Sequence, residues 1–175
     1  MALPGLIFCD SPADLARALA AGVPRPATVV GVGNALRGDD AFGPAVIAAL
    51  RPSPRLHLFD VQAVPESYLV PIVESGCASV VFVDAADLGA EPGRVALVPA
   101  SRLAEVDVST HAISLWLVSE AIRALARDRG RQVACTLLAA QPEGLEEADR
   151  MSRAVRRAIA LAAAGIKAFA EAPSA

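Results

Sequence analysis

Hydrophobic and polar positions follow two alternating periods along the chain, one typical of strands and one typical of helices. A continuous β-branched run at residues 27–32 predicts a strand that is buried on both faces, as in a parallel sheet. Further apolar runs bounded by turn residues predict strands at 56–60, 79–85, 94–98 and 132–140. Five such runs indicate a mostly parallel sheet.

Segments with apolar residues three or four positions apart lie between these runs and predict helices. They cover residues 43–50, 66–73, 109–125 and 148–166, and a short helix with Ser11 as its cap precedes the first strand. This order predicts an α/β fold, a three-layer sandwich with a mostly parallel sheet of about five strands flanked by helices. We expect one domain over residues 1–175, with a core at 27–170 and an N-terminal extension at 1–26.

Composition narrows the classes of partner. The formal net charge is −3, whereas a protein that binds a phosphate backbone needs a dense basic face, so we expect no nucleic-acid partner. No apolar run reaches the roughly 18 residues of a membrane span, so we expect no membrane association. Cys9, Cys77 and Cys135 lie far apart in apolar surroundings and are expected to be reduced, which predicts a cytoplasmic protein.

The segment GVGNALRGDD at residues 31–40 follows the first predicted strand and is similar to the start of a dinucleotide-binding loop. The third glycine of that motif is missing, because Leu36 occupies its position. Asp39 and Asp40 would also repel a pyrophosphate at the following helix N-terminus. A nucleotide-binding enzyme is therefore kept only as an alternative, and either aspartate could instead cap that helix.

Three of the predicted strands end in aspartate or lead into it. In an open α/β sheet, ligands bind beyond the carboxyl ends of the strands, where Asp60, Asp84 and the pair Asp39–Asp40 are expected to lie. His111 starts a predicted helix. Taken singly, Asp60 and Asp84 could be turn residues and His111 a helix-start histidine. Together, two carboxylates and an imidazole form a ligand set that suits a divalent ion such as zinc or nickel.

These landmarks resemble those of the [NiFe]-hydrogenase maturation endopeptidases, which share a GxGNxLxxDDxxG pattern after the first strand. The matching string here is GVGNALRGDDAFG, from residue 31 to residue 43. Three later segments resemble the family in the same order: FVDAADLGAEPG at 82–93, STHAISLWLV at 109–118 and AAQPEG at 139–144. The resemblance covers about residues 27–166.

The resemblance implies an endopeptidase that removes the C-terminal extension of a hydrogenase large-subunit precursor after nickel insertion. The family's metal-binding residues fall here on Asp40, Asp84 and His111. The metal is then a divalent ion at the recognition site, the nickel carried by the substrate. Asp40 and Asp60 are the candidate catalytic residues, with Asp60 orienting the peptide or assisting proton transfer.

One alternative function stays open within the same resemblance. A relative that keeps the nickel-recognising residues but has lost cleavage would act as a non-cleaving checkpoint protein in hydrogenase assembly. The large-subunit precursor is the expected partner in both cases, and we expect the chain to act as a monomer. The helix before residue 27 departs from the family pattern, because members generally begin at the first strand.

Overall fold

A six-stranded sheet forms the centre of the computed structural model, which describes residues 5–105, 114–144 and 150–173. The strands are β1 (Ile7–Cys9), β2 (Ala27–Val32), β3 (Leu56–Gln62), β4 (Ser79–Ala85), β5 (Val95–Pro99) and β6 (Ala134–Ala140). Their order across the sheet is β1-β5-β6-β4-β2-β3. The four strands from β6 to β3 are parallel neighbours, whereas β5 runs antiparallel to both β6 and β1. The predicted mostly parallel sheet is confirmed.

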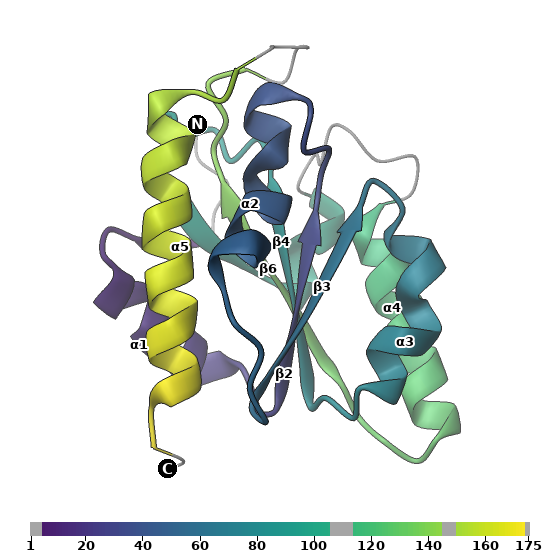
Figure 1. The fold of residues 1–175 in the computed structure, drawn as a ribbon. Coiled ribbons are helices and arrows are strands. Elements are labelled where there is room, and N and C mark those ends of the chain that lie inside the picture. The colour runs from purple at the N-terminus through teal and green to yellow at the C-terminus, as the bar shows by residue number, and fades with distance from the viewer. Residues whose placement is uncertain (1–4, 106–113, 145–149, 174–175) are drawn as a thin grey trace.

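Five α-helices of the described chain cover both faces of this sheet (Figure 1). One face carries α1 (Pro12–Gly22), α2 (Phe42–Ala49) and α5 (Arg153–Glu171), and the other carries α3 (Leu69–Glu74) and α4 (Leu115–Asp128). The described residues also form three 3-10 turns: η1 (Gly38–Ala41), η2 (Pro65–Tyr68) and η3 (Ala100–Glu105). The three-layer α/β prediction is confirmed.

The two central strands explain why their runs are continuously apolar. Every residue of β2 and β4 is buried, because helices cover both faces of the sheet at this point. Successive side chains of a strand point to opposite faces of the sheet, so they pack into the two hydrophobic cores on either side of it. Val29 and Val81 pack on the side of α1, α2 and α5, while Val30 and Phe82 pack on the side of α3 and α4.

The sheet has one strand more than the sequence pattern predicts. β1 has three residues and pairs with β5 at the edge of the sheet, with Phe8 opposite Ala96. Such a short run contains too few residues to establish a period. The N-terminal segment thus extends the sheet, and its helix α1, capped by Ser11 as predicted, packs against α5.

The segment predicted as a helix over 66–73 begins as the 3-10 turn η2 and becomes α-helical at Leu69. Pro71 is the third residue of α3, in the first turn, where its missing N–H costs no hydrogen bond within the helix. The helix α3, which has six residues, therefore tolerates this proline.

Two other helices begin later than their patterns predict. α4 starts at Leu115, after Ser114, whose Oγ accepts the N–H of Trp116 at 3.2 Å. The predicted caps at 109 and 110 lie outside the described residues. α5 starts at Arg153 rather than at 148, which also lies outside them, and it continues for 19 residues. None of the described helices combines the length and the hydrophobicity needed to cross a bilayer.

Candidate active site

The loop after β2 folds back on itself and brings Gly33 next to Asp40. Gly33 has a φ of +126°, and a Cβ atom on it would lie 1.9 Å from the carbonyl oxygen of Asp40. The N–H of Asn34 donates to Oδ2 of Asp40 at 2.9 Å, and Oδ1 of Asn34 accepts the N–H of Leu36 at 2.9 Å. One oxygen of the Asp40 carboxylate is thus held by the backbone of its own loop.

Glycine also lets α2 approach the ends of two strands. A Cβ atom on Gly43 would lie 2.1 Å from the carbonyl oxygen of Val32 and 2.3 Å from that of Val83. Val32 ends β2, and Val83 lies two residues before the end of β4. The turn η1, which carries Asp39 and Asp40, therefore lies at the carboxyl edge of β2 and β4, where the sequence places it.

Asp39 is the buried member of the acidic pair, with 6% of its surface exposed. Its Oδ1 accepts the backbone N–H of Ser152 at 2.7 Å, and its Oδ2 accepts that of Glu143 at 2.8 Å. The prediction that one of the two aspartates caps the following helix is wrong, since α2 begins after Ala41 without a side-chain cap. Asp39 instead binds the segment between β6 and α5.

Asp84 is fully buried near the end of β4, and its Oδ1 accepts the N–H of Ala85 at 2.8 Å. Its neighbours in the strand, Val83 and Ala85, point to the side of α2, so Asp84 points to the side of α3 and α4. Because β2 and β4 are adjacent and parallel, Asp40 and Asp84 lie at the same edge of the sheet, one partly exposed and the other buried.

Asp60 is exposed in β3, opposite Gly31 of β2. Its Oδ1 accepts the N–H of Gln62 at 3.2 Å, and Gln62 has a positive φ of 50°. The carbonyl oxygen of Gln62 in turn accepts the N–H of Gly33 at 3.0 Å. Asp60 is thus linked through one strained residue to the loop that carries Asp40, and its role in catalysis stays a prediction.

The predicted metal ligand His111 lies outside the described residues. Within residues 5–105, 114–144 and 150–173, no group of three or more histidine, cysteine, aspartate or glutamate side chains is arranged to hold a metal ion. Asp40 and Asp84 are the two predicted ligands whose places in the fold are described. A divalent ion at this edge of the sheet stays a prediction.

Gln141 is a residue whose contribution the sequence pattern did not indicate. It follows β6 directly and is 9% exposed, and its Oε1 accepts the N–H of Leu88 at 2.7 Å and that of Ala90 at 3.2 Å. Its backbone also pairs with Gly93 and Arg94. Gln141 therefore holds the β4–β5 loop in the same way that Asp39 holds the β6–α5 segment. In the sequence, the position of Gln141 directly after a predicted strand is the feature that could have indicated its role.

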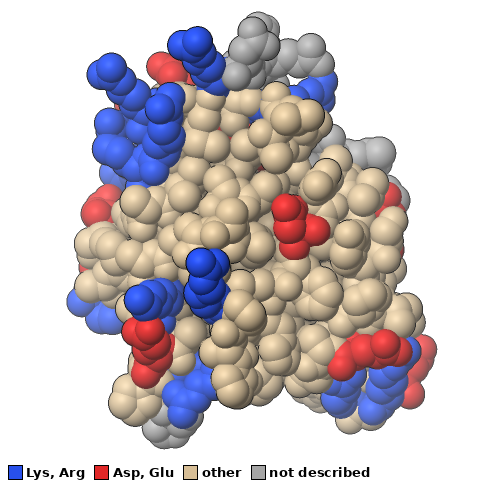
Figure 2. Space-filling model, viewed as in Figure 1, with Lys and Arg blue, Asp and Glu red and all other residues tan. Residues whose placement is uncertain are grey.

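Basic side chains gather over the beginning of α5 (Figure 2). The exposed arginines of this surface are Arg150, Arg153, Arg156 and Arg157. Because Ser152 is bound by Asp39, this basic surface lies at the same end of the molecule as the acidic residues.

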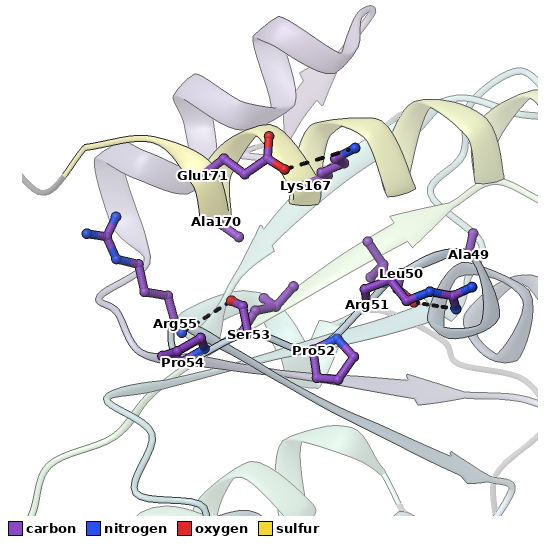
Figure 3. A pocket seen from close by; sticks show the side chains of 11 residues that line it. Ala49, Leu50, Arg51, Pro52, Ser53, Pro54, Arg55, Lys167, Ala170 and Glu171 are labelled. Atoms are coloured by element: carbon purple, nitrogen blue, oxygen red, sulfur yellow. Dashed lines mark hydrogen bonds and ion pairs between the residues drawn. The ribbon is translucent and has the colours of Figure 1, made fainter.

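A pocket of about 510 Å³ lies at the opposite edge of the sheet, between the α2–β3 connection and the end of α5 (Figure 3). Leu50 and Leu56 form its buried lining, and Lys167 and Glu171 stand 4.0 Å apart on its rim. The predicted site residues do not line it. The candidate active site predicted from the sequence is therefore separate from this pocket.

The comparison with family models decides the class of this protein. A model described as hydrogenase maturation protease matches residues 46–168, more than half of the chain. The chain belongs to the hydrogenase maturation protease family. The resemblance stated on the sequence motifs is thereby confirmed.

Individual members of the family are similar to this chain to different extents. The hydrogenase 3 maturation protease of Escherichia coli K12 is 31% identical over 81 residues, which are 45% of this chain and 52% of the relative. A putative hydrogenase maturation protease of Methanocaldococcus jannaschii is 31% identical over 81 residues, with 53% of its length covered. The matched region thus spans about half the length of these curated relatives.

Solved structures of family members extend the likeness over most of the chain. The [NiFe] hydrogenase maturation protease HycI of Thermococcus kodakarensis KOD1 superposes with a TM-score of 0.71 at 30% identity, covering 87% of this chain and 98% of that one. The endopeptidase HybD of Escherichia coli superposes with a TM-score of 0.63 at 22% identity, covering 80% of this chain and 88% of that one, which shows a common fold.

Proposed function

We propose that this protein is an endopeptidase that removes the C-terminal extension of a [NiFe]-hydrogenase large-subunit precursor after nickel has been inserted. Membership of the hydrogenase maturation protease family supports the class of reaction and of substrate. The observation that carries the proposal is that Asp40 and Asp84 both lie at the carboxyl ends of the adjacent parallel strands β2 and β4. This is the edge where α/β sheets bind ligands.

The proposed ligands of the substrate's nickel are Asp40, Asp84 and His111. Two carboxylate oxygens and an imidazole nitrogen are donors that a divalent transition ion accepts. A metal ligand has to be accessible and oriented. Asp40 is partly exposed, and its Oδ2 accepts the N–H of Asn34. The metal then belongs to the substrate and reports that the precursor's own centre is loaded.

Hydrolysis requires that a water oxygen bonds to the scissile carbonyl carbon and that the carbon–nitrogen bond breaks. One proton of the water passes to the departing amine. Asp60 is proposed to assist this transfer or to orient the peptide, since it is an exposed carboxylate next to the loop of Asp40. A nearby divalent ion would polarise the carbonyl or acidify the water.

The proposed setting is the cytoplasm, and the proposed active form is a single chain. Cys9, Cys77 and Cys135 are free thiols, and all three are buried. Free cysteines are typical of proteins in reducing compartments.

The direct test is incubation of the protein with a nickel-loaded large-subunit precursor, followed by mass spectrometry of the products. We expect the precursor to lose one C-terminal peptide. Asp40→Asn should abolish this loss, because the substitution removes the charge while leaving an oxygen that can accept the N–H of Asn34.

Asp87→Asn is the matched control, because Asp87 is an exposed carboxylate in the β4–β5 loop that accepts the N–H of Gly89 at 3.0 Å. It should process the precursor at the wild-type rate. A stable complex of wild-type protein and loaded precursor without any product would contradict the proposed cleavage and favour the non-cleaving checkpoint protein.

A further inference from the structure

We infer that Asp39 is a positioning residue, whose carboxylate holds the turn η1 in the orientation that Asp40 needs. The importance of Asp40 for cleavage rests on the proposed function, whereas the contacts of Asp39 are seen in the structure. Asp39 and Asp40 are consecutive residues of the 3-10 turn η1. Asp39 reaches towards α5, whereas Asp40 turns back to its own loop.

The Asp39 carboxylate is held at both of its oxygens. Oδ1 accepts the N–H of Ser152 at 2.7 Å, and Oδ2 accepts the N–H of Glu143 at 2.8 Å. Two bonds to different oxygens determine the plane of the carboxylate as well as its position. The donors belong to the two ends of the segment that connects β6 with α5, so the Asp39 side chain bridges these two ends.

The charge of Asp39 has a stabilising environment although the side chain is only 6% exposed. Ser152 is the N-cap residue of α5, and its Oγ accepts the N–H of Val155 at 3.1 Å. A negative charge at the N-terminus of a long helix is favoured by the helix dipole. Two backbone N–H donors and the end of α5 together compensate the burial of this carboxylate.

Holding Asp39 constrains Asp40 because of the geometry of the turn. Successive side chains of a 3-10 helix point about 120° apart around its axis. If Asp39 cannot leave Ser152 and Glu143, the turn cannot rotate, and the Asp40 carboxylate keeps facing the N–H of Asn34. The Asn34 amide proton therefore reports the position of Asp40 without any need for substrate.

The first test is Asp39→Asn, followed by amide hydrogen exchange. An amide side chain offers one acceptor oxygen, so either Glu143 or Ser152 loses its partner. We expect that amide and the amide of Asn34 to exchange at least about tenfold faster, the effect of one lost charge-assisted hydrogen bond. The amide of Val30, in the centre of β2, should keep its wild-type rate.

The second test separates the N–H of Ser152 from its hydroxyl. Ser152 has a φ of −63°, which proline adopts, so Ser152→Pro replaces the N–H that binds Asp39 with a ring carbon, from which the carboxylate must move away. Ser152→Ala removes only the cap oxygen, which both variants lose. We expect Ser152→Pro to accelerate Asn34 exchange, and to lower kcat for the loaded precursor about tenfold at an unchanged KM. Ser152→Ala should leave Asn34 exchange and kcat at wild-type values.

Asp14→Asn serves as a control for loss of a carboxylate at a helix start, because Asp14 accepts the Ser11 hydroxyl at 2.7 Å in α1. It should leave Asn34 unaffected. Equal Asn34 exchange in Ser152→Pro and Ser152→Ala, or equal acceleration of Asn34 and Val30 in Asp39→Asn, would overturn the inference. If the wild type does not cleave but Asn34 still responds as expected, the proposed function fails and the positioning role stands.

Discussion

Gly33 and Asp40 lie so close together that a Cβ atom on Gly33 would fall 1.9 Å from the carbonyl oxygen of Asp40. Gly33 also has a φ of +126°, which side chains rarely permit. Gly33→Ala should therefore lower the free energy of unfolding by about 2 kcal/mol or more and displace Asp40. Urea denaturation measures the first effect, and precursor processing measures the second.

Gly22→Ala is the comparison for that substitution, because a Cβ atom at Gly22 meets nothing within 4 Å. It should raise the free energy of unfolding by less than about 1 kcal/mol, because alanine lowers the conformational entropy of the unfolded chain. Equal stability and equal processing in the two variants would contradict the close packing of Gly33 against Asp40.

Asp60 has a structural contact and a proposed catalytic role, and two substitutions separate them. Asp60→Asn keeps an oxygen for the N–H of Gln62 and removes the basic carboxylate, whereas Asp60→Ala removes both. If Asp60 transfers a proton, both variants should lose about 100-fold or more in kcat. A fall in kcat for Asp60→Ala alone would leave Asp60 as a support of the Gln62 turn.

Gln141→Leu should destabilise the β4–β5 loop. The substitution leaves the N–H groups of Leu88 and Ala90 without the acceptor that Oε1 provides. Each unsatisfied buried donor costs about 1–3 kcal/mol. Thermal or urea denaturation measures the loss, and Gln132→Leu, at an exposed glutamine before β6, should cost less than about 0.5 kcal/mol. Similar losses in both variants would show that the loop does not depend on Gln141.

Cys135 predicts how stability changes in alkaline solution. Burial raises the pKa of this thiol from 9.0 to about 12. In the unfolded chain the thiol ionises near pH 9, so between pH 9 and 12 unfolding releases a proton that the folded state retains. The stabilisation is complete below pH 9 and is lost as pH rises, at up to about 1.4 kcal/mol per pH unit.

Urea denaturation of the wild type and of Cys135→Ala over this range checks the prediction. The difference in unfolding free energy between the two proteins should shrink as pH rises, because the variant lacks the titrating thiol. A difference that is independent of pH would contradict the raised pKa.

The fold was predictable where burial is uniform along an element. The predicted strands at 27–32 and 79–85 match β2 and β4 residue for residue, since strands covered by helices on both sides require an unbroken apolar run. β1 was missed because three residues at an edge carry no period. The start of α4 was misplaced because Ser109, Thr110 and Ser114 are equally suitable caps in sequence.

The site was predictable only in part. Asp40 follows β2, and Asp60 and Asp84 lie within two residues of the ends of β3 and β4. Parallel strands bring their carboxyl ends to one edge, so the common location of these residues follows from the chain order. The side of the sheet was not predicted. Asp84 points towards α3 and α4, and that direction became known only once the two cores were assigned.

The sequence by itself determined the α/β class, the central strands, the acidic edge and the family pattern. All of these depend on residues that are near one another in the chain or on strand order. The tertiary structure decided what Asp39 does. Local rules predict a helix cap, yet its partners Glu143 and Ser152 are 104 and 113 residues away. A buried carboxylate binds whichever donors packing brings to it, and only the folded chain shows which donors those are.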